Sequence, residues 1–319
     1  GAGADNTSGL AFAGTTGSFT AATEEWNTSV PIGSWASGGS LNTARNHLGS
    51  AGTKAATLVF GGATAPDTET NKTEQYNGSA FSEVSDLNTA RRTNGTGATY
   101  TAAIAIGGYS SAPDATFNQT ETWNGSSWTE VNDLNSGLGD AMCNGTTTSA
   151  LDYGGDTISP STKVATCESW NGTSWTEVAD LNTARASGSN AGNAGNTVGL
   201  CSGGRDPSAA VANNESWNGS AWTEVNDMNG AIRNNRGGGT STSAISAGGN
   251  APPYTAETET WNGTIWSNDT SMSTARQNGV MRAASSTSGI YVGGAVATIL
   301  SVTEEFTGDA KTTKTISTD

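Results

Sequence analysis

The chain has 319 residues, enough for one large domain or two ordinary ones. Its 29 acidic and 14 basic residues give a net charge of −15, and the resulting repulsion argues against nucleic acid and anionic membrane as partners. Leu, Ile, Val and Phe make up only 40 residues, a proportion typical of disordered chains. The ten tryptophans recur at nearly fixed intervals, however, so an ordered core has to come from a repeat.

Small residues open each repeating unit. Segments such as 49–52 and 187–191 are rich in Gly, Ala and Ser, and we predict that they form the innermost strand of a sheet, where space is crowded. An apolar strand follows and ends in glycine, with a weaker Ala13-Gly14 in the first unit. The glycine pairs of the other units are Gly61-Gly62, Gly107-Gly108, Gly154-Gly155, Gly203-Gly204, Gly248-Gly249 and Gly293-Gly294.

A Glu-x-aromatic strand comes next, after a loop of roughly ten residues. In five units it leads into Asn-Gly, a dipeptide that tolerates positive φ and is a strong hairpin signal. A second aromatic stands five residues after the first in five units, whereas the first unit has a looser Trp35, nine residues on. The Glu-x-aromatic pairs, spaced 44 to 50 residues apart, are Glu24/Trp26, Glu74/Tyr76, Glu121/Trp123, Glu168/Trp170, Glu215/Trp217, Glu259/Trp261 and Glu304/Phe306.

These elements predict an all-β fold, because no segment has the 3.6-residue apolar period of a helix. Four short strands per unit is the content of one propeller blade, and aromatic rings that each bury about 150–250 Å² can fill the gaps between blades. We predict one domain, 1–319, that forms a seven-bladed propeller with four antiparallel strands per blade. Its first and last blades would close the ring by side-chain packing without a shared strand, with Lys311–Ser317 as the outermost last strand. The predicted repeats are approximately 1–42, 43–89, 90–136, 137–183, 184–230, 231–274 and 275–319.

The order of these features resembles the kelch repeat. A glycine pair after an apolar strand, an aromatic about a dozen residues on, a Trp soon after and an Arg opening the next unit are found along essentially the whole chain. The hairpin is shorter than is usual in kelch units, and Asn-Gly replaces the common Asp-Pro. The sequences of Trp123–Asn135 and Thr303–Gly308 are also similar to those of propeller proteins of marine bacteriophages. The first resemblance implies a propeller of six or seven blades, and the second implies a component of a virion surface.

Arginines near the start of the inner strands are one candidate site. They would form a basic ring at the channel mouth that could hold a carboxylated or sulfated glycan through bidentate hydrogen bonds. The alternative, which we favour, is that each pairs with a repeat Glu or Asp of the adjacent blade. The sevenfold Glu is likewise expected to serve the blade, since a unique site needs unlike residues in different blades. The five arginines are Arg45, Arg91, Arg185, Arg233 and Arg276, while Asp140 stands in that neighbourhood of another unit.

The loops after the glycine pairs are the other candidate, because function tends to lie where the scaffold leaves the sequence unconstrained. Tyr109 and Tyr254 could stack on sugar rings, with Asp156 and Arg205 supplying hydrogen bonds. The alternative is that these four are ordinary exposed loop residues.

Catalysis is not expected. Cys143, Cys167 and Cys201 form no CxxC motif, and the single histidine, His47, cannot assemble a zinc or copper site, so we predict no metal and no cofactor. A sialidase-type Ser-x-Asp-x-Gly-x-Thr-Trp box is missing, as is a phosphate-binding loop. No apolar run reaches the roughly 18 residues of a membrane span, and the start does not resemble a secretory leader.

Together these features favour a non-enzymatic propeller on a virion surface or otherwise outside the cell. It would be a surface or tail-associated module that contacts host-surface glycans or neighbouring assembly proteins, with several copies raising avidity. An intracellular kelch-type adaptor that binds another protein is the second hypothesis. A carbohydrate-active enzyme is the third.

Overall fold

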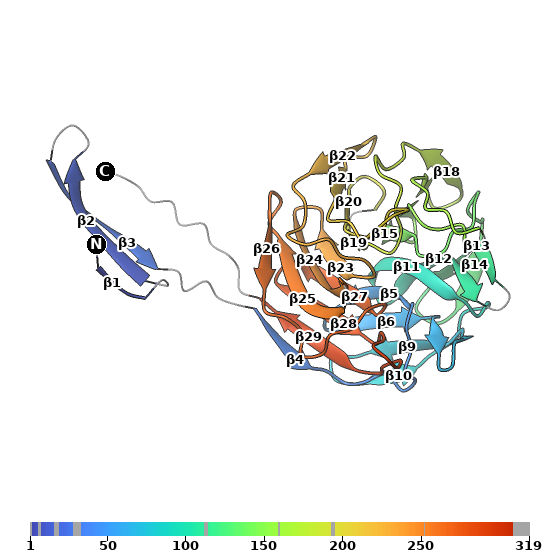
Figure 1. Cartoon of the computed structure of the whole chain (residues 1–319). Coiled ribbons are helices and arrows are strands. Elements are labelled where there is room, and N and C mark those ends of the chain that lie inside the picture. Colours follow the sequence, from blue (N-terminus) through green and yellow to red (C-terminus); the bar gives the residue numbers. More distant parts are fainter. Residues whose placement is uncertain are drawn as a thin grey trace.

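The computed structural model describes residues 2–5, 8–15, 19–27, 33–111, 114–158, 160–192, 195–251 and 253–308, and the side chains of those from 33 onward. Strands and turns account for the regular structure of these residues. Six four-stranded antiparallel sheets are arranged as blades around a central axis (Figure 1). The chain is therefore an all-β propeller whose blades have four antiparallel strands, as the repeat predicted.

Each blade runs from an inner strand at the axis to an outer strand. Blade 1 has β5 (Gly49–Thr53), β6 (Ala56–Phe60), β9 (Thr73–Tyr76) and β10 (Phe81–Glu83), with the short pair β7 (Ala63–Thr64) and β8 (Thr68–Glu69) beside it; blade 2 has β11 (Arg92–Thr99), β12 (Ala102–Ser111), β13 (Asp114–Trp123) and β14 (Trp128–Val131); blade 3 has β15 (Met142–Thr146), β16 (Ser149–Tyr153), β17 (Cys167–Trp170) and β18 (Trp175–Val178). Blade 4 has β19 (Ser189–Ala191), β20 (Gly199–Ser202), β21 (Asn214–Trp217) and β22 (Trp222–Val225); blade 5 has β23 (Arg236–Thr240), β24 (Ser243–Asn250), β25 (Tyr254–Trp261) and β26 (Trp266–Asp269); blade 6 has β27 (Val280–Ser285), β28 (Ser288–Val292), β29 (Thr303–Thr307) and β4 (Ser34–Ser37).

The inner strands close a ring. They contact one another in the order β5, β11, β15, β19, β23 and β27, and β27 contacts β5 again. The ring of the described residues thus has six blades, where the repeat count predicted seven. The first repeat is divided: β1 (Ala2–Asp5), β2 (Ser8–Thr15) and β3 (Phe19–Asn27) form a separate three-stranded sheet, whereas β4 joins blade 6.

The closure also corrects the expectation that no strand is shared. β4 lies beside β29 and pairs with it (Figure 1). Trp35 is therefore opposite Phe306, with ring centroids 5.2 Å apart. The reason lies in the aromatic spacing. Trp35 is nine residues from Trp26, too far for the tight hairpin of the other units, while no second aromatic follows Phe306 in its own repeat. The segment Lys311–Ser317, predicted as the outermost strand, lies outside the described residues.

Tryptophans fill the spaces between blades, as predicted. In blade 2, Trp123 and Trp128 face each other across the hairpin with centroids 5.5 Å apart, and both are buried against Phe60 and Leu58 of blade 1. The indole nitrogen of Trp128 also donates to the hydroxyl of Thr73 in blade 1, at 3.2 Å. Burying these large rings replaces the aliphatic interior that the composition lacks.

A buried ion pair fixes the segment that leads into a blade. In blade 1, Arg45 and Glu74 lie 2.8 Å apart and neither side chain is exposed to solvent. The second oxygen of Glu74 accepts the backbone amide of Asn42 at 2.8 Å, so the glutamate holds the incoming segment at two points. The same pair recurs as Arg91–Glu121, Arg185–Glu215 and Arg276–Glu304.

Candidate functional site at the channel mouth

Residues with a left-handed backbone conformation surround one end of the central channel. Each lies two positions after the residue that occupies the position of the buried arginine in its repeat. Their backbones are joined from blade to blade: His47 donates its amide to the carbonyl of Asn278 at 2.8 Å, Asn234 to Ser187 at 2.7 Å, and Ser187 to Asp140 at 2.9 Å. All five have φ between 50° and 59°, a conformation in which Asn, Asp and His are enriched among non-glycine residues. These main-chain links bring one side chain from each of several blades to the axis.

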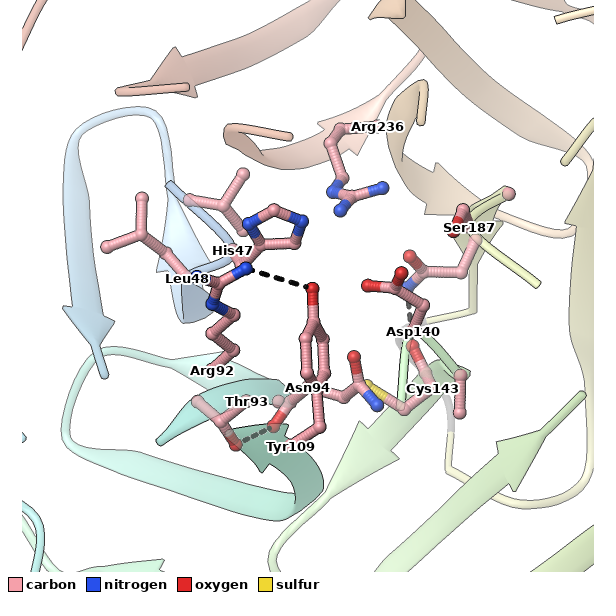
Figure 2. Close-up of a pocket in the computed structure, with 15 residues that line it drawn as sticks. His47, Leu48, Arg92, Thr93, Asn94, Tyr109, Asp140, Cys143, Ser187 and Arg236 are labelled. Carbon is pink, nitrogen blue, oxygen red and sulfur yellow. Dashed lines mark hydrogen bonds between the residues drawn. The ribbon is translucent and has the colours of Figure 1, made fainter. Parts of the chain in front are cut away.

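The side chains at this end line a hollow of about 520 Å³, its open entrance included. We call it the channel-mouth hollow. Its polar lining comes from five of the six blades and the segments that lead into them, and it differs from blade to blade (Figure 2). The chemically distinctive members are His47, Arg92, Tyr109, Asp140, Ser187, Asn190 and Arg236.

Arg92 and Tyr109 form one wall. The guanidinium carbon of Arg92 lies 5.2 Å from the centre of the Tyr109 ring, and its Nη1 donates to the phenol oxygen at 3.4 Å (Figure 2). Arg92 also forms ion pairs with Asp67 and Glu69. Burial, assisted by the charge of Asp140, raises the pKa of Tyr109, so the phenol stays neutral and can donate or accept a hydrogen bond.

His47 lies edge-on to Tyr109, with ring centroids 5.8 Å apart. Burial lowers the pKa of His47 to about 4; Asp140 opposes this, and Arg236 and Arg92 add to it. The imidazole is therefore neutral at physiological pH and offers the hollow one donor and one acceptor rather than a charge.

Arg236 supplies the positive charge of the opposite wall. Its Nε donates to the carbonyl of Gly279 at 3.0 Å and its Nη1 to that of Asn235 at 3.0 Å, so two backbone carbonyls fix its direction. Among the described residues no carboxylate forms an ion pair with it, and Figure 2 shows its guanidinium directed into the hollow. Its remaining donors are thus oriented toward any ligand that enters.

Another arginine crosses the channel farther along the same inner strands. Arg282 of β27 donates through Nη2 to the carbonyl of Gly97 in blade 2 at 2.9 Å. Burial lowers the pKa of Arg282 to about 10, which still leaves the side chain charged at neutral pH. The hollow is consequently a recess at the mouth, with a bridging side chain deeper in the channel.

The four predicted loop residues occupy different places. Tyr109, Asp156 and Arg205 hold equivalent positions in blades 2, 3 and 4, because each pairs by backbone with the residue that follows the arginine position. Only Tyr109 lines the channel-mouth hollow. Asp156 is buried in an ion pair with Lys163, whereas Arg205 is exposed, as is Tyr254, which begins β25.

The predicted arginine ring is mostly scaffold. Arg45, Arg91, Arg185 and Arg276 are fully buried in their pairs with glutamate, so their guanidinium groups are not presented at the mouth. Arg233 does not belong to this set: the amide of Gly204 donates to the carbonyl of Ile232, just as Gly62 donates to Arg91. Ile232 therefore holds the repeat position, and Arg233 follows it by one residue.

Sequence reasoning missed Arg92 and Arg236, and it noted Asp140 only as the residue near the arginine position of another unit. A signal was present for the two arginines, because each begins a segment that is otherwise made of small residues. The described lining of the hollow suits hydrogen bonding to a polar ligand through one cation without an ion pair, one carboxylate and several neutral groups. Among the described residues, no group of His, Cys, Asp and Glu side chains could hold a metal ion. No helix in the described part of the chain is long and apolar enough to cross a membrane.

Comparison with known proteins bears on the fold. Neither a protein-family model nor a curated protein sequence matches the chain. Solved structures do match it, 247 chains in all, so the architecture is a common one and does not define an activity. The structure of YjhT is 12% identical and has a TM-score of 0.67, over 83% of this chain and 95% of that one. This likeness identifies the class, a β-propeller, and nothing narrower.

Proposed function

We propose that the chain is a non-enzymatic binding propeller, displayed on the outside of a virion or a comparable assembly, that holds the end of a glycan in the channel-mouth hollow. One observation carries this proposal. The residues that build the blades repeat, whereas the two-after-arginine position reads His47, Thr93, Asp140, Ser187, Asn234 and Asn278 around the ring. The four of these that line the hollow, His47, Thr93, Asp140 and Ser187, all differ from one another. Unlike side chains gathered in one hollow are what recognition of a single ligand requires.

The chemistry of the hollow suits a sugar. Tyr109 presents an aromatic ring, and Ser187, Asn190 and the neutral His47 offer hydrogen bonds for hydroxyl groups. Arg236 adds a fork-shaped cation that can hold a carboxylate by two parallel hydrogen bonds. A carboxylated sugar would use all of these groups at once, so we favour it over a neutral one.

Binding is favoured over glycoside hydrolysis by the number of acids. Glycosidases commonly use two carboxyl groups about 5–10 Å apart, and Asp140 is the one carboxylate among the described residues that line the hollow.

Placement on a virion rests on the resemblance of Trp123–Asn135 to phage propellers and on the acidic composition. Several copies on one particle would turn weak single contacts into firm attachment.

A glycan array that pairs each uronic or sialic acid with its neutral counterpart tests the proposal. We expect the carboxylated members to bind, and Arg236→Gln to weaken them by about tenfold or more, the loss of one charge-assisted contact. Arg233→Gln is the matched control, since Arg233 lies three residues away and does not line the hollow. Equal binding of neutral sugars, turnover of the glycan, or equal loss in both variants would contradict the proposal.

A further inference from the structure

The buried arginine of blade 1 defines what a guanidinium site looks like in this fold. Arg45 donates through Nη1 to the carbonyls of Gly61 at 2.9 Å and Lys72 at 2.6 Å, and through Nη2 to Glu74 at 2.8 Å. The acceptors are the first glycine of the pair, the residue two before the repeat glutamate, and the glutamate itself. Blade 2 uses the same three positions for Arg91.

Blade 5 keeps the acceptors but lacks the arginine. Ile232 holds the arginine position, as the hydrogen bond from Gly204 to its carbonyl shows, and an isoleucine side chain has no donor. By repeat position the three acceptors in this blade are Gly248, Glu257 and Glu259.

These three residues line a second hollow, of about 320 Å³ with its entrance, together with Ile232 and Ser246. Their presence in one cavity places the acceptors around space that an arginine fills in four other blades. This hollow shares no residue with the channel-mouth hollow, so it is a separate site from the one proposed for a glycan. Gly230 and Ala231, both exposed, form its rim and leave it open to solvent.

Glu259 is the group that most needs a partner there. It is 8% exposed, and one of its oxygens accepts the amide and the side-chain nitrogen of Asn229 at 2.9 and 2.8 Å. Among the described residues it has no ion pair, unlike the glutamates of blades 1, 2, 4 and 6. Burial raises the pKa of Glu259, against the lowering effect of hydrogen bonds from Asn229 and from the backbone of Gly230, as expected for a carboxylate without a cation.

We propose that the hollow of blade 5 is a binding site for a guanidinium group supplied from outside the chain. Two carbonyls and one carboxylate suit the planar fork of guanidinium, which carries five donors, better than the compact ammonium of lysine. The group could come from a small guanidinium compound or from an arginine side chain of a partner protein.

Titration with methylguanidinium, followed by NMR of the protein and by calorimetry, tests the site. We expect saturable binding to the full chain, with methylammonium at the same concentration binding at least about tenfold more weakly. Ile232→Arg should abolish the binding, because its own guanidinium would occupy the hollow as in the other blades. Glu259→Gln should weaken it by about tenfold or more.

The variants also keep the proposal falsifiable. Ile232→Arg restores the residue of the repeat, so we expect it to fold and to melt at a temperature no lower than that of the unchanged chain. Equal binding of methylguanidinium to this variant, or equal binding of methylammonium, would show only attraction to an acidic surface and would overturn the proposal. A capped tripeptide with a central arginine distinguishes the sources: tighter binding than methylguanidinium indicates a protein partner, and weaker binding a small compound.

Discussion

The blades and the channel mouth of this propeller differ in how far their residues repeat from one unit to the next. In the blades, the same residues recur at the same positions, and pairs such as Arg45–Glu74 are sealed from solvent. At the mouth, equivalent positions carry different side chains, and charged groups such as Arg236 remain open to a ligand. Repetition therefore marks what holds the molecule together, and variation at a repeated position marks the site that we propose for a ligand.

The largest effect should come from breaking the closure of the ring. We expect removal of residues 1–38, which includes β4, to destabilise the propeller by about 5 kcal/mol or more. It would cost the packing of the partly buried Trp35, about 2–3 kcal/mol, and several strand hydrogen bonds of about 1 kcal/mol each. Calorimetric melting measures the loss.

Removal of residues 1–32 is the control, because it keeps β4. The six-bladed ring should then melt within a few degrees of the full chain, since a loss below about 1 kcal/mol shifts Tm little. A large loss from this shorter deletion would show instead that β1–β3 contribute a seventh blade.

Next in size is the loss of a repeated ion pair. Arg45→Met leaves Glu74 buried without a cation, and we expect the free energy of unfolding to fall by about 3–5 kcal/mol. Urea denaturation provides the value. The double variant Arg45→Met/Glu74→Met should recover much of it, whereas Arg233→Met should change it by less than about 0.5 kcal/mol. A similar cost for Arg45 and Arg233 would contradict the distinction between scaffold and mouth.

A smaller effect concerns protonation at the mouth. His47 is the only histidine, so its imidazole signals in a proton NMR titration need no assignment, and they should report a pKa of about 4 rather than 6.5. Because the folded-state pKa lies below the unfolded one, the neutral imidazole favours folding above about pH 6.5. This contribution is lost as the pH falls toward 4.

Two variants sharpen this titration. Asp140→Asn should lower the pKa of His47 further, since the carboxylate raises it, and Arg236→Gln should raise it. A normal pKa in the unchanged chain would mean that His47 is not enclosed as the structure has it.

The smallest effect is expected at the left-handed positions. Ser187 has φ of 59°, a conformation that costs an L-residue about 1–2 kcal/mol and glycine almost nothing. Since glycine also loses more entropy on folding, Ser187→Gly should stabilise the propeller by no more than about 1 kcal/mol. Ser187→Val should destabilise it by more than that. Thermal melts of both variants compare them, and a lower Tm for the glycine variant would count against backbone strain at the rim.

The repeat allowed the blades to be predicted almost strand by strand. Trp123 and Trp128 face each other across the hairpin and are buried between blades because their spacing fits only that geometry. The number of blades could not be obtained this way, since the pairing of Trp35 with Phe306 joins residues 271 positions apart.

Less of the candidate site could be predicted. Tyr109 was found because the repeat does not require it, but Arg92 and Arg236 lie on inner strands that were read as scaffold. Arg233 was assigned to the repeated arginines although it lies one residue after their position. Only the hydrogen bond from the amide of Gly204 to the carbonyl of Ile232 reveals this shift. A local pattern shows which positions vary, whereas the meeting of those positions at one axis depends on the closed ring.

The rim of the channel is joined through amides and carbonyls, as in the bond from Asn234 to Ser187. Main-chain joints do not depend on which side chain they carry, so long as the residue accepts the left-handed turn. Ligand preference can thus drift through exchanges at a handful of rim residues while the architecture is inherited unchanged.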